Sequence, residues 1–340
     1  MINAQEITIP LVRPDLTQAD QECFLAQLNG KPFLDGKAVA QWERAWQEIW
    51  QRPCVAFADA TTLIKALKTV FGWSSGQPIS CGPLLPPSWR EALHEAWLDP
   101  IPQATLEDHG QEMWLDNAEL SATGSAKEAN PAVRMVQHHF GRPAQASANA
   151  TTTLEEVSAL LKPVDQTGWG TVQLINLDGN RMIQGGGSTL ALSTDRSLIA
   201  RLKKIRTTPP AAAICALGIS QLRRLAAQLN RRQALARRYG EIRNRNFFIS
   251  PPNIPSERSW EMYLLHFNDL KKRDGLLHFL NRAGIGAALP IWHHQSQPNP
   301  LDLSLALPLY ASLSDIEQKR IINRIHRWVE RGGPETPQTN

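Results

Sequence analysis

Cysteine is scarce in this chain, and the few that occur are far apart. The four cysteines, Cys23, Cys54, Cys81 and Cys215, form no CxxC pair, and no histidine cluster accompanies them at ligand spacing. These absences argue against a disulfide framework and against a zinc site. We therefore expect four reduced cysteines that serve in packing, and no bound metal.

Long apolar runs are also absent. No stretch approaches the roughly 20 apolar residues of a membrane span, and the first residues, MINAQEITIP, lack a basic segment followed by an apolar one. With 340 residues, 42% hydrophobic and 20% charged, the composition fits a soluble chain with one large domain and a smaller one. We expect a cytoplasmic protein without a membrane partner, and a disordered tail at 332–340.

Acidic residues are nearly missing between residues 220 and 245, a segment that contains eight arginines and a single acidic residue, Glu241. Apolar residues recur there at steps of three and four, which predicts a long amphipathic helix with its arginines mostly off the apolar stripe. A solvated face is favoured over a polyanion-binding face, because no DNA-reading signature accompanies the charge. Nucleic acid is therefore the least favoured partner. The arginines are Arg223, Arg224, Arg231, Arg232, Arg237, Arg238, Arg243 and Arg245.

Short apolar segments alternate with helical patterns in the first 200 residues. Strands are predicted at 54–58, in PISCGPLLPP and IPQATLED, and at 132–141, and helices at 16–28, 36–50, 59–70 and 88–98. This alternation predicts an α/β protein with a mostly parallel sheet covered on both faces, in three layers. From Asp195 the pattern turns helical, and a strand at 259–267 with helices at 276–283 and 314–329 predicts a smaller C-terminal α+β domain.

Residues 170–194, GTVQLINLDGNRMIQGGGSTLALST, have the pattern of a hairpin. A strand at 172–177 leads into a turn around Asp178, and a glycine triplet at 185–187 precedes a second strand at 190–192. Arg181 lies just after the first turn. The triplet is too short and wrongly placed for a nucleotide-binding loop, so a tight hairpin turn is favoured.

This hairpin resembles, without a gap, the lysine-bearing segment of the DegT/DnrJ/EryC1/StrS sugar aminotransferase family. The resemblance implies fold type I of pyridoxal-phosphate enzymes and ancestry among enzymes that aminate nucleotide-linked keto sugars. The change in sequence pattern divides the chain into a large domain at 1–205 and a small domain with the Arg-rich helix at 206–331. The resemblance also implies a homodimer, and leaves open a heterodimer with an intact paralogue. Other segments match in the same order: GKAVAQWERAWQEIW (36–50), AVRMVQHHFGRPA (132–144), ALGISQLRRLAAQLNRRQALARRYGEI (216–242), SWEMYLLHF, RAGIGAALP and LALPLYASLSDIEQKRIINRI.

The same resemblance puts Arg181 where the family has the lysine that forms the internal aldimine. A guanidinium stays protonated at physiological pH and cannot attack a carbonyl, so no covalent pyridoxal phosphate is expected. Where the family grips the cofactor phosphate with serine, glycine and threonine, this chain has Asp59, Ala60 and Thr61. In a partly buried pocket the carboxylate of Asp59, which is also a good helix cap, would repel a dianion.

Four further positions follow from the resemblance. Asn176 stands where a phosphate-binding serine is usual. The aromatic residue that stacks on the cofactor ring falls near Pro86 or Pro87 in this chain, with Trp89 as a displaced substitute. Glu156 stands at the aspartate that holds the ring nitrogen if 153–159 is a strand, but its spacing from Thr153 also fits a capping box and a helix start. His138 stands at the family's histidine, and we expect it to be structural rather than catalytic.

Three functions are compatible with these residues. The first is a degenerate, non-enzymatic or regulatory homologue that kept the fold after losing cofactor chemistry. The second is an enzyme or binding protein for a nucleotide sugar, in which Arg181 pairs with a phosphate or carboxylate, in polysaccharide or secondary-metabolite biosynthesis. The third, a polyanion-binding module, is ranked last.

Overall fold

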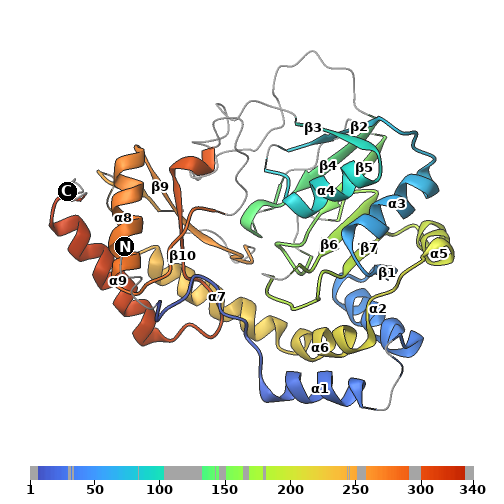
Figure 1. Cartoon of the computed structure of the whole chain (residues 1–340), viewed down its shortest axis with the longest axis horizontal. Coiled ribbons are helices and arrows are strands. Elements are labelled where there is room, and N and C mark those ends of the chain that lie inside the picture. The colour runs from blue at the N-terminus through green and yellow to red at the C-terminus, as the bar shows by residue number, and fades with distance from the viewer. Residues whose placement is uncertain are drawn as a thin grey trace, which may run out of the picture. The chain divides into compact units, whose positions relative to one another are not determined.

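The computed structural model describes residues 7–29, 32, 34–82, 84–102, 132–141, 143–144, 151–163, 168–178, 181–242, 244, 246–250, 258–290 and 300–333. They form two compact units (Figure 1). The larger unit contains the described residues from Leu16 to Ala227, and the smaller unit contains those before Leu16 and from Gln228 onward. The sequence pattern placed this boundary near residue 206, whereas the contacts divide the chain between Ala227 and Gln228.

A seven-stranded sheet organises the described part of the larger unit, in the order β1-β7-β6-β5-β4-β2-β3. Four neighbouring pairs, β2/β3, β2/β4, β4/β5 and β5/β6, are parallel, whereas β7 runs antiparallel to both β1 and β6. The predicted mostly parallel α/β sheet is therefore confirmed. The strands are β1 (Cys54–Phe57), β2 (Gln77–Cys81), β3 (Leu98–Pro102), β4 (Val133–Gln137), β5 (Thr152–Glu156), β6 (Val172–Asn176) and β7 (Thr189–Leu192).

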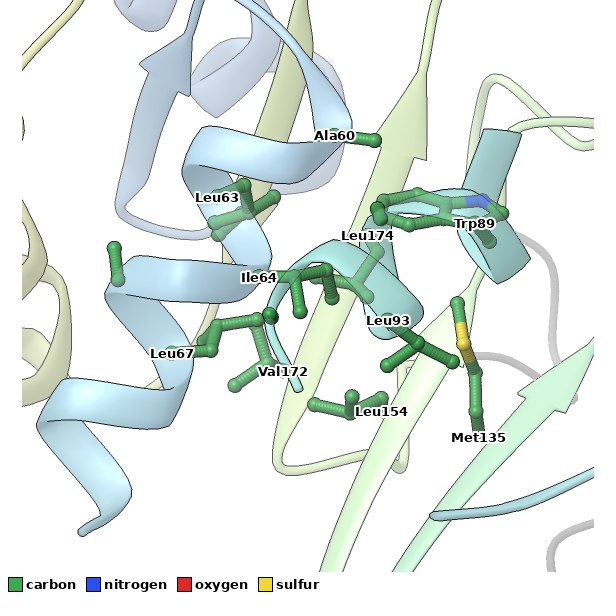
Figure 2. Close-up of a cluster of buried hydrophobic side chains, with 14 of the residues drawn as sticks. Ala60, Leu63, Ile64, Leu67, Trp89, Leu93, Met135, Leu154, Val172 and Leu174 are labelled. Atoms are coloured by element: carbon green, nitrogen blue, oxygen red, sulfur yellow. The ribbon is translucent and has the colours of Figure 1, made fainter. Parts of the chain in front are cut away.

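Helices cover both faces of this sheet. On one face α3 (Ala60–Phe71), α4 (Pro87–Glu95) and α5 (Arg196–Ile205) bury a continuous apolar core against alternate strand residues (Figure 2). On the other face α2 (Gly36–Trp50) packs against α6 (Ala212–Leu222), and α1 (Gln18–Leu28) runs along α6 (Figure 1). β1, β5, β6 and β7 are buried along their whole length, as strands shielded by helices on both faces must be.

The predicted apolar stripe of α2 is buried as expected. Trp42 and Trp46 are both inaccessible to solvent, and their rings meet edge to face with centroids 5.5 Å apart. Gly218 of α6 lies against the ring of Trp42, so closely that an added Cβ would stand 2.4 Å from a ring carbon. The missing side chain at Gly218 therefore allows α6 to approach α2.

Two ambiguous segments are resolved by the structure. Residues 152–156 form the strand β5, so the strand interpretation of 153–159 is confirmed as far as Glu156, a turn follows at 158–160, and the alternative helix start is wrong. Asp59 does cap α3, since its carboxylate accepts a hydrogen bond of 2.7 Å from the backbone N–H of Thr62. The glycine triplet forms the expected tight turn, in which Gly186 and Gly187 take φ angles of 58° and 84°.

The smaller unit has its own core around a three-stranded antiparallel sheet in the order β10-β9-β8. The strand predicted at 259–267 and the two closing helices are confirmed, whereas the short β8 and β10 had no signal of their own. The elements are α7 (Leu225–Tyr239), which begins just before the boundary, β8 (Phe248–Ile249), β9 (Tyr263–Phe267), α8 (Leu270–Arg282), β10 (Ser304–Leu307) and α9 (Asp315–Glu330), with a short 3-10 helix at Pro300–Leu303. A second 3-10 helix, His139–Gly141, follows β4 in the larger unit.

The single long Arg-rich helix predicted around residues 220–245 is wrong. A turn at Arg223 and Arg224, closed by a 2.9 Å bond from the N–H of Arg224 to the carbonyl of Gln221, separates α6 from α7, which ends at Tyr239. The apolar spacing continues across this turn, so periodicity could not reveal it. Among the described residues, none of the helices combines the length and apolar character needed to cross a membrane.

Candidate ligand site at the carboxyl edge of the sheet

Three polar residues end neighbouring parallel strands on one face of the large sheet. Gln137 and Glu156 are paired in register at the ends of β4 and β5, and Asn176 ends β6. Residues two positions earlier on these strands, Met135 and Leu174 among them, belong to the core beneath α3 and α4. Because side chains alternate between faces along a strand, the three polar side chains lie on this same face.

Hydrogen bonds connect this edge to the hairpin that follows β6. Ser158 donates from its backbone N–H (3.2 Å) and its hydroxyl to the carboxylate of Glu156, and the hydroxyl accepts a 2.7 Å bond from the N–H of Asn176. The side chain of Asn176 donates to Ser88 of α4 at 2.9 Å, and the Ser88 hydroxyl lies 3.4 Å from the carboxylate of Asp178. We call these residues, with Arg181, the carboxyl-edge network.

Arg181 is a buried residue at the end of this network. Only 5% of it is exposed, and its Nε lies 3.4 Å from Oδ1 of Asp178. Its backbone is also fixed, because its N–H donates to the carbonyl of Asp178 at 3.1 Å and its carbonyl accepts from the side chain of Gln184 at 2.8 Å. Arg181 is therefore not a solvated surface cation.

Three of the predicted site residues, Glu156, Asn176 and Arg181, are thus brought together. Ser88, Ser158 and Asp178 connect them. Sequence reasoning missed Ser88 and Ser158 because an isolated serine in a helix or after a strand carries no signal. Their roles follow only from the strand order that places α4 and β5 beside β6.

The residues at the start of α3 lie outside these hydrogen bonds. Asp59 is exposed, whereas the sequence interpretation had placed it in a partly buried pocket. Water screens an exposed charge, so repulsion of each unit charge of a dianion at 4 Å falls toward about 1 kcal/mol. Ala60 is buried and Thr61 is half-buried. The carboxylate of Asp59 nonetheless uses one of the free N–H groups that a bound phosphate would otherwise accept from.

Trp89 lies in the apolar core rather than on an open surface. Its side chain is inaccessible to solvent, and Figure 2 shows it near Met135 and Leu93, with its ring nitrogen turned away from the side chains of α3. The indole N–H has no hydrogen-bond acceptor within the described part of the chain.

His138 belongs to the opposite face and contacts a different carboxylate. Its Nε2 lies 3.0 Å from Oε1 of Glu155, and neither side chain is accessible to solvent. The backbone N–H of Ala144 donates to Nδ1 at 2.8 Å, which leaves the proton of a neutral imidazole on Nε2. His138 is therefore positioned as a donor to Glu155, as expected for a structural histidine.

Glu155 accepts three further hydrogen bonds. The N–H groups of Gly168 and Gly170 donate at 2.7 and 2.9 Å, and the side chain of Gln173 donates at 3.0 Å. Burial acts to raise the pKa of Glu155, but the bonds from His138 and the two glycines outweigh it and hold that pKa below its ordinary value.

The carboxyl-edge network is distinct from a surface depression near the C-terminal end of α2. Among the described residues, no group of three or more histidine, cysteine, aspartate or glutamate side chains could hold a metal ion. The depression, of about 450 Å³, is lined by residues of the C-terminal end of α2 and the start of α5, and contains none of the predicted site residues. The residues that line the depression are Gln47, Glu48, Gln51, Arg52, Pro53 and Arg196.

The three-layer sheet, with polar side chains gathered where its parallel strands end, matches the structures of fold type I pyridoxal-phosphate aminotransferases. Residues 211–326, which run from α6 into α9 and follow the strands of the large sheet, match the model of the DegT/DnrJ/EryC1/StrS aminotransferase family, in agreement with the resemblance read from that part of the sequence. No curated protein matches the chain by sequence.

Several solved structures superpose on nearly the whole chain. PseC of Helicobacter pylori, an aminotransferase involved in the biosynthesis of pseudoaminic acid, is 17% identical with a TM-score of 0.81, covering 95% of this chain and 99% of its own. The aminotransferase TlmJ of Streptoalloteichus hindustanus is 17% identical with a TM-score of 0.80, at the same coverage. The sugar aminotransferase CalS13 of Micromonospora echinospora is 16% identical with a TM-score of 0.78, covering 94% of this chain and 100% of its own.

Proposed function

We propose that this protein is a homologue of nucleotide-sugar aminotransferases that forms no covalent bond with pyridoxal phosphate and has lost transamination. The observation that carries the proposal is the buried Arg181, held beside Asp178 in the hairpin that resembles the family's lysine-bearing segment. A guanidinium cannot become the neutral amine that an aldimine requires.

Two residues elsewhere in the larger unit also argue against the cofactor. The carboxylate of Asp59 occupies a free N–H at the start of α3, where the resemblance puts the cofactor phosphate. Lys203, which could be imagined to replace the missing lysine, forms a 2.8 Å ion pair with the buried Glu43. Moving its amine to another site would leave Glu43 with one partner fewer in a poorly solvated position.

The test is an absorption spectrum of the protein incubated with pyridoxal phosphate and then gel-filtered, before and after borohydride, because gel filtration removes the loose Schiff bases that the free aldehyde forms with surface lysines. We expect the filtered protein to show no aldimine band and to retain no cofactor for borohydride to fix. A band that reduction fixes to the protein would overturn the proposal.

A second function, non-covalent binding of a nucleotide sugar, is favoured by the same buried cation. Planar guanidinium groups bind phosphate and carboxylate oxygens in pairs, and burial strengthens such charge-assisted bonds. Calorimetry with UDP-N-acetylglucosamine tests this alternative. Arg181→Ala should weaken binding strongly, and equal binding by the variant would exclude Arg181 from the role.

The assembly and cellular setting belong to this proposal. We infer a homodimer, as the family resemblance implies, located in the cytoplasm. We also infer a role in polysaccharide or secondary-metabolite synthesis, because the similar structures include an aminotransferase involved in the biosynthesis of pseudoaminic acid. A molar mass measured by light scattering decides the assembly: one chain mass, 37.9 kDa, would contradict the dimer.

A further inference from the structure

Gln137 ends β4 with a side chain that has no hydrogen-bond partner among the residues that the structure describes. The residue is 5% exposed, and both its amide nitrogen and its amide oxygen are buried and unsatisfied. A buried amide without partners keeps the full cost of losing its water, so proteins rarely retain one unless something else satisfies it. The contrast with Gln173 is direct, because the buried amide of Gln173 donates to Glu155 and to the carbonyl of Gly170.

The position of this amide joins it to the candidate site. Gln137 is the register partner of Glu156 and lies on the same face of the sheet. Its amide oxygen reaches the carboxyl end of β2, where a Cβ added to Gly82 would stand 3.0 Å away. The unpartnered N–H of Trp89 belongs to the same face, since Trp89 packs in the core cluster that includes Met135.

The chemistry of these neighbours restricts what can satisfy Gln137. A primary amide offers two donors and an acceptor, so its best partner both accepts and donates, as a hydroxyl or another amide does. The carboxylate of the adjacent Glu156 disfavours an anion at this point. An anionic group suits Arg181 at the other end of the network, so the two positions differ in the charge they accept.

We propose that Gln137 binds the sugar part of a nucleotide sugar through its hydroxyl or amide groups. This inference rests on the second function proposed above, non-covalent nucleotide-sugar binding at the carboxyl edge. It assigns the uncharged part of the ligand to Gln137 and the charged part to the neighbourhood of Arg181.

The substitution Gln137→Leu tests the inference in protein prepared without pyridoxal phosphate. Leucine has a similar volume and removes both unsatisfied atoms, so the melting temperature of the ligand-free variant should stay equal or rise. The matched control is Gln173→Leu, which should lower it because it breaks hydrogen bonds that the native amide makes. The second readout is calorimetry with UDP-N-acetylglucosamine and with UDP alone.

For Gln137→Leu we expect affinity for UDP-N-acetylglucosamine to fall by about tenfold or more, with UDP binding unchanged. The proposal is overturned if Gln137→Leu lowers the melting temperature as Gln173→Leu does, or if both proteins bind UDP-N-acetylglucosamine equally. It is also overturned if the unmodified chain does not bind this sugar nucleotide. An aldimine band in the separate cofactor experiment would instead contradict the loss of transamination.

Discussion

The imidazole of His138 and the carboxylate of Glu155 form a hydrogen-bonded pair 3.0 Å apart with no access to solvent. The carboxylate of Glu155 makes most of the contacts around this pair, since it accepts four hydrogen bonds from three segments of the larger unit. Through these hydrogen bonds the pair connects the end of β4 to β5 and to the turn before β6. It therefore holds in register the strands whose ends carry the carboxyl-edge network.

Glu155→Gln should destabilise the protein by about 2–4 kcal/mol, because an amide group then faces N–H donors and a buried network loses an acceptor. Urea unfolding at neutral pH measures this. The control is Glu95→Gln, whose exposed carboxylate lies 3.9 Å from Lys65 and should change stability by less than about 0.5 kcal/mol. Equal effects of the two substitutions would contradict the assigned role of Glu155.

The pH dependence of stability follows from the hydrogen bonds of Glu155. The pKa of Glu155 lies below its ordinary 4.5 in the folded chain, so its stabilising contribution is present above pH 4.5 and is lost as the pH falls through the lower folded value. The free energy of unfolding of the native protein should therefore drop below about pH 4.5, and Glu155→Gln should reduce that drop. If the variant loses as much stability below pH 4.5 as the native protein does, the pKa of Glu155 is not lowered by folding.

The packing of α6 on α2 gives a second prediction. Gly218→Ala should gain up to about 1 kcal/mol in helix propensity, but its Cβ would stand 2.4 Å from the rigid ring of Trp42. Overpacking of this kind costs about 1–3 kcal/mol, so we expect net destabilisation in urea unfolding. Gly36→Ala is the control, because nothing lies within 4 Å of an added Cβ there, and it should be neutral or stabilising.

Thiol reactivity distinguishes the four cysteines. Burial raises the pKa of Cys54 well above its ordinary value, that of Cys81 to about 11 and that of Cys215 to about 12, whereas Cys23 is half-buried. The thiolate is the reactive form, so brief iodoacetamide treatment at pH 8 should modify Cys23 alone, and all four cysteines after denaturation. Rapid native modification of any buried cysteine, found by peptide mass spectrometry, would contradict the structure there.

The arginines of α7 are largely engaged within the chain. Arg231 and Arg238 bind the carboxylate of Asp315 at 2.7 and 2.5 Å, and hydrogen bonds from Arg238 and Arg231 hold the pKa of Asp315 at about 2. We expect weak retention on heparin, and Asp315→Asn should raise the eluting salt concentration by freeing both guanidinium groups. Glu330→Gln on the same helix changes the charge equally and should have the smaller effect; equal shifts would show that net charge alone controls retention.

The sequence predicted most of the large unit because its strongest signals are local. Alternating apolar runs identified β1, β4, β6 and β7, and the stripe containing Trp42 and Trp46 identified α2. The break at Arg223 was missed because apolar spacing is continuous there. The exposure of Asp59 was also missed, because capping residues look the same in sequence whether they lie at the surface or in a pocket.

The candidate site was predictable only where the resemblance aligned this sequence with the functional positions of the family. Glu156, Asn176 and Arg181 were named in advance, but Gln137 was not, although it precedes His138 directly. A glutamine in a strand is ordinary until its burial and its lack of partners are known. Such properties arise from tertiary packing, which local patterns do not encode.

The central claim, that Arg181 leaves no amine to bind pyridoxal phosphate, is tested most directly by intact-mass spectrometry after incubation with the cofactor and borohydride. Arg181→Lys is the positive control, because it restores an amine at this position and should gain the mass of one reduced cofactor, more fully when Asp59→Ser is added. The account predicts an unchanged mass for the native protein. A native chain carrying one reduced cofactor at a defined lysine would contradict it.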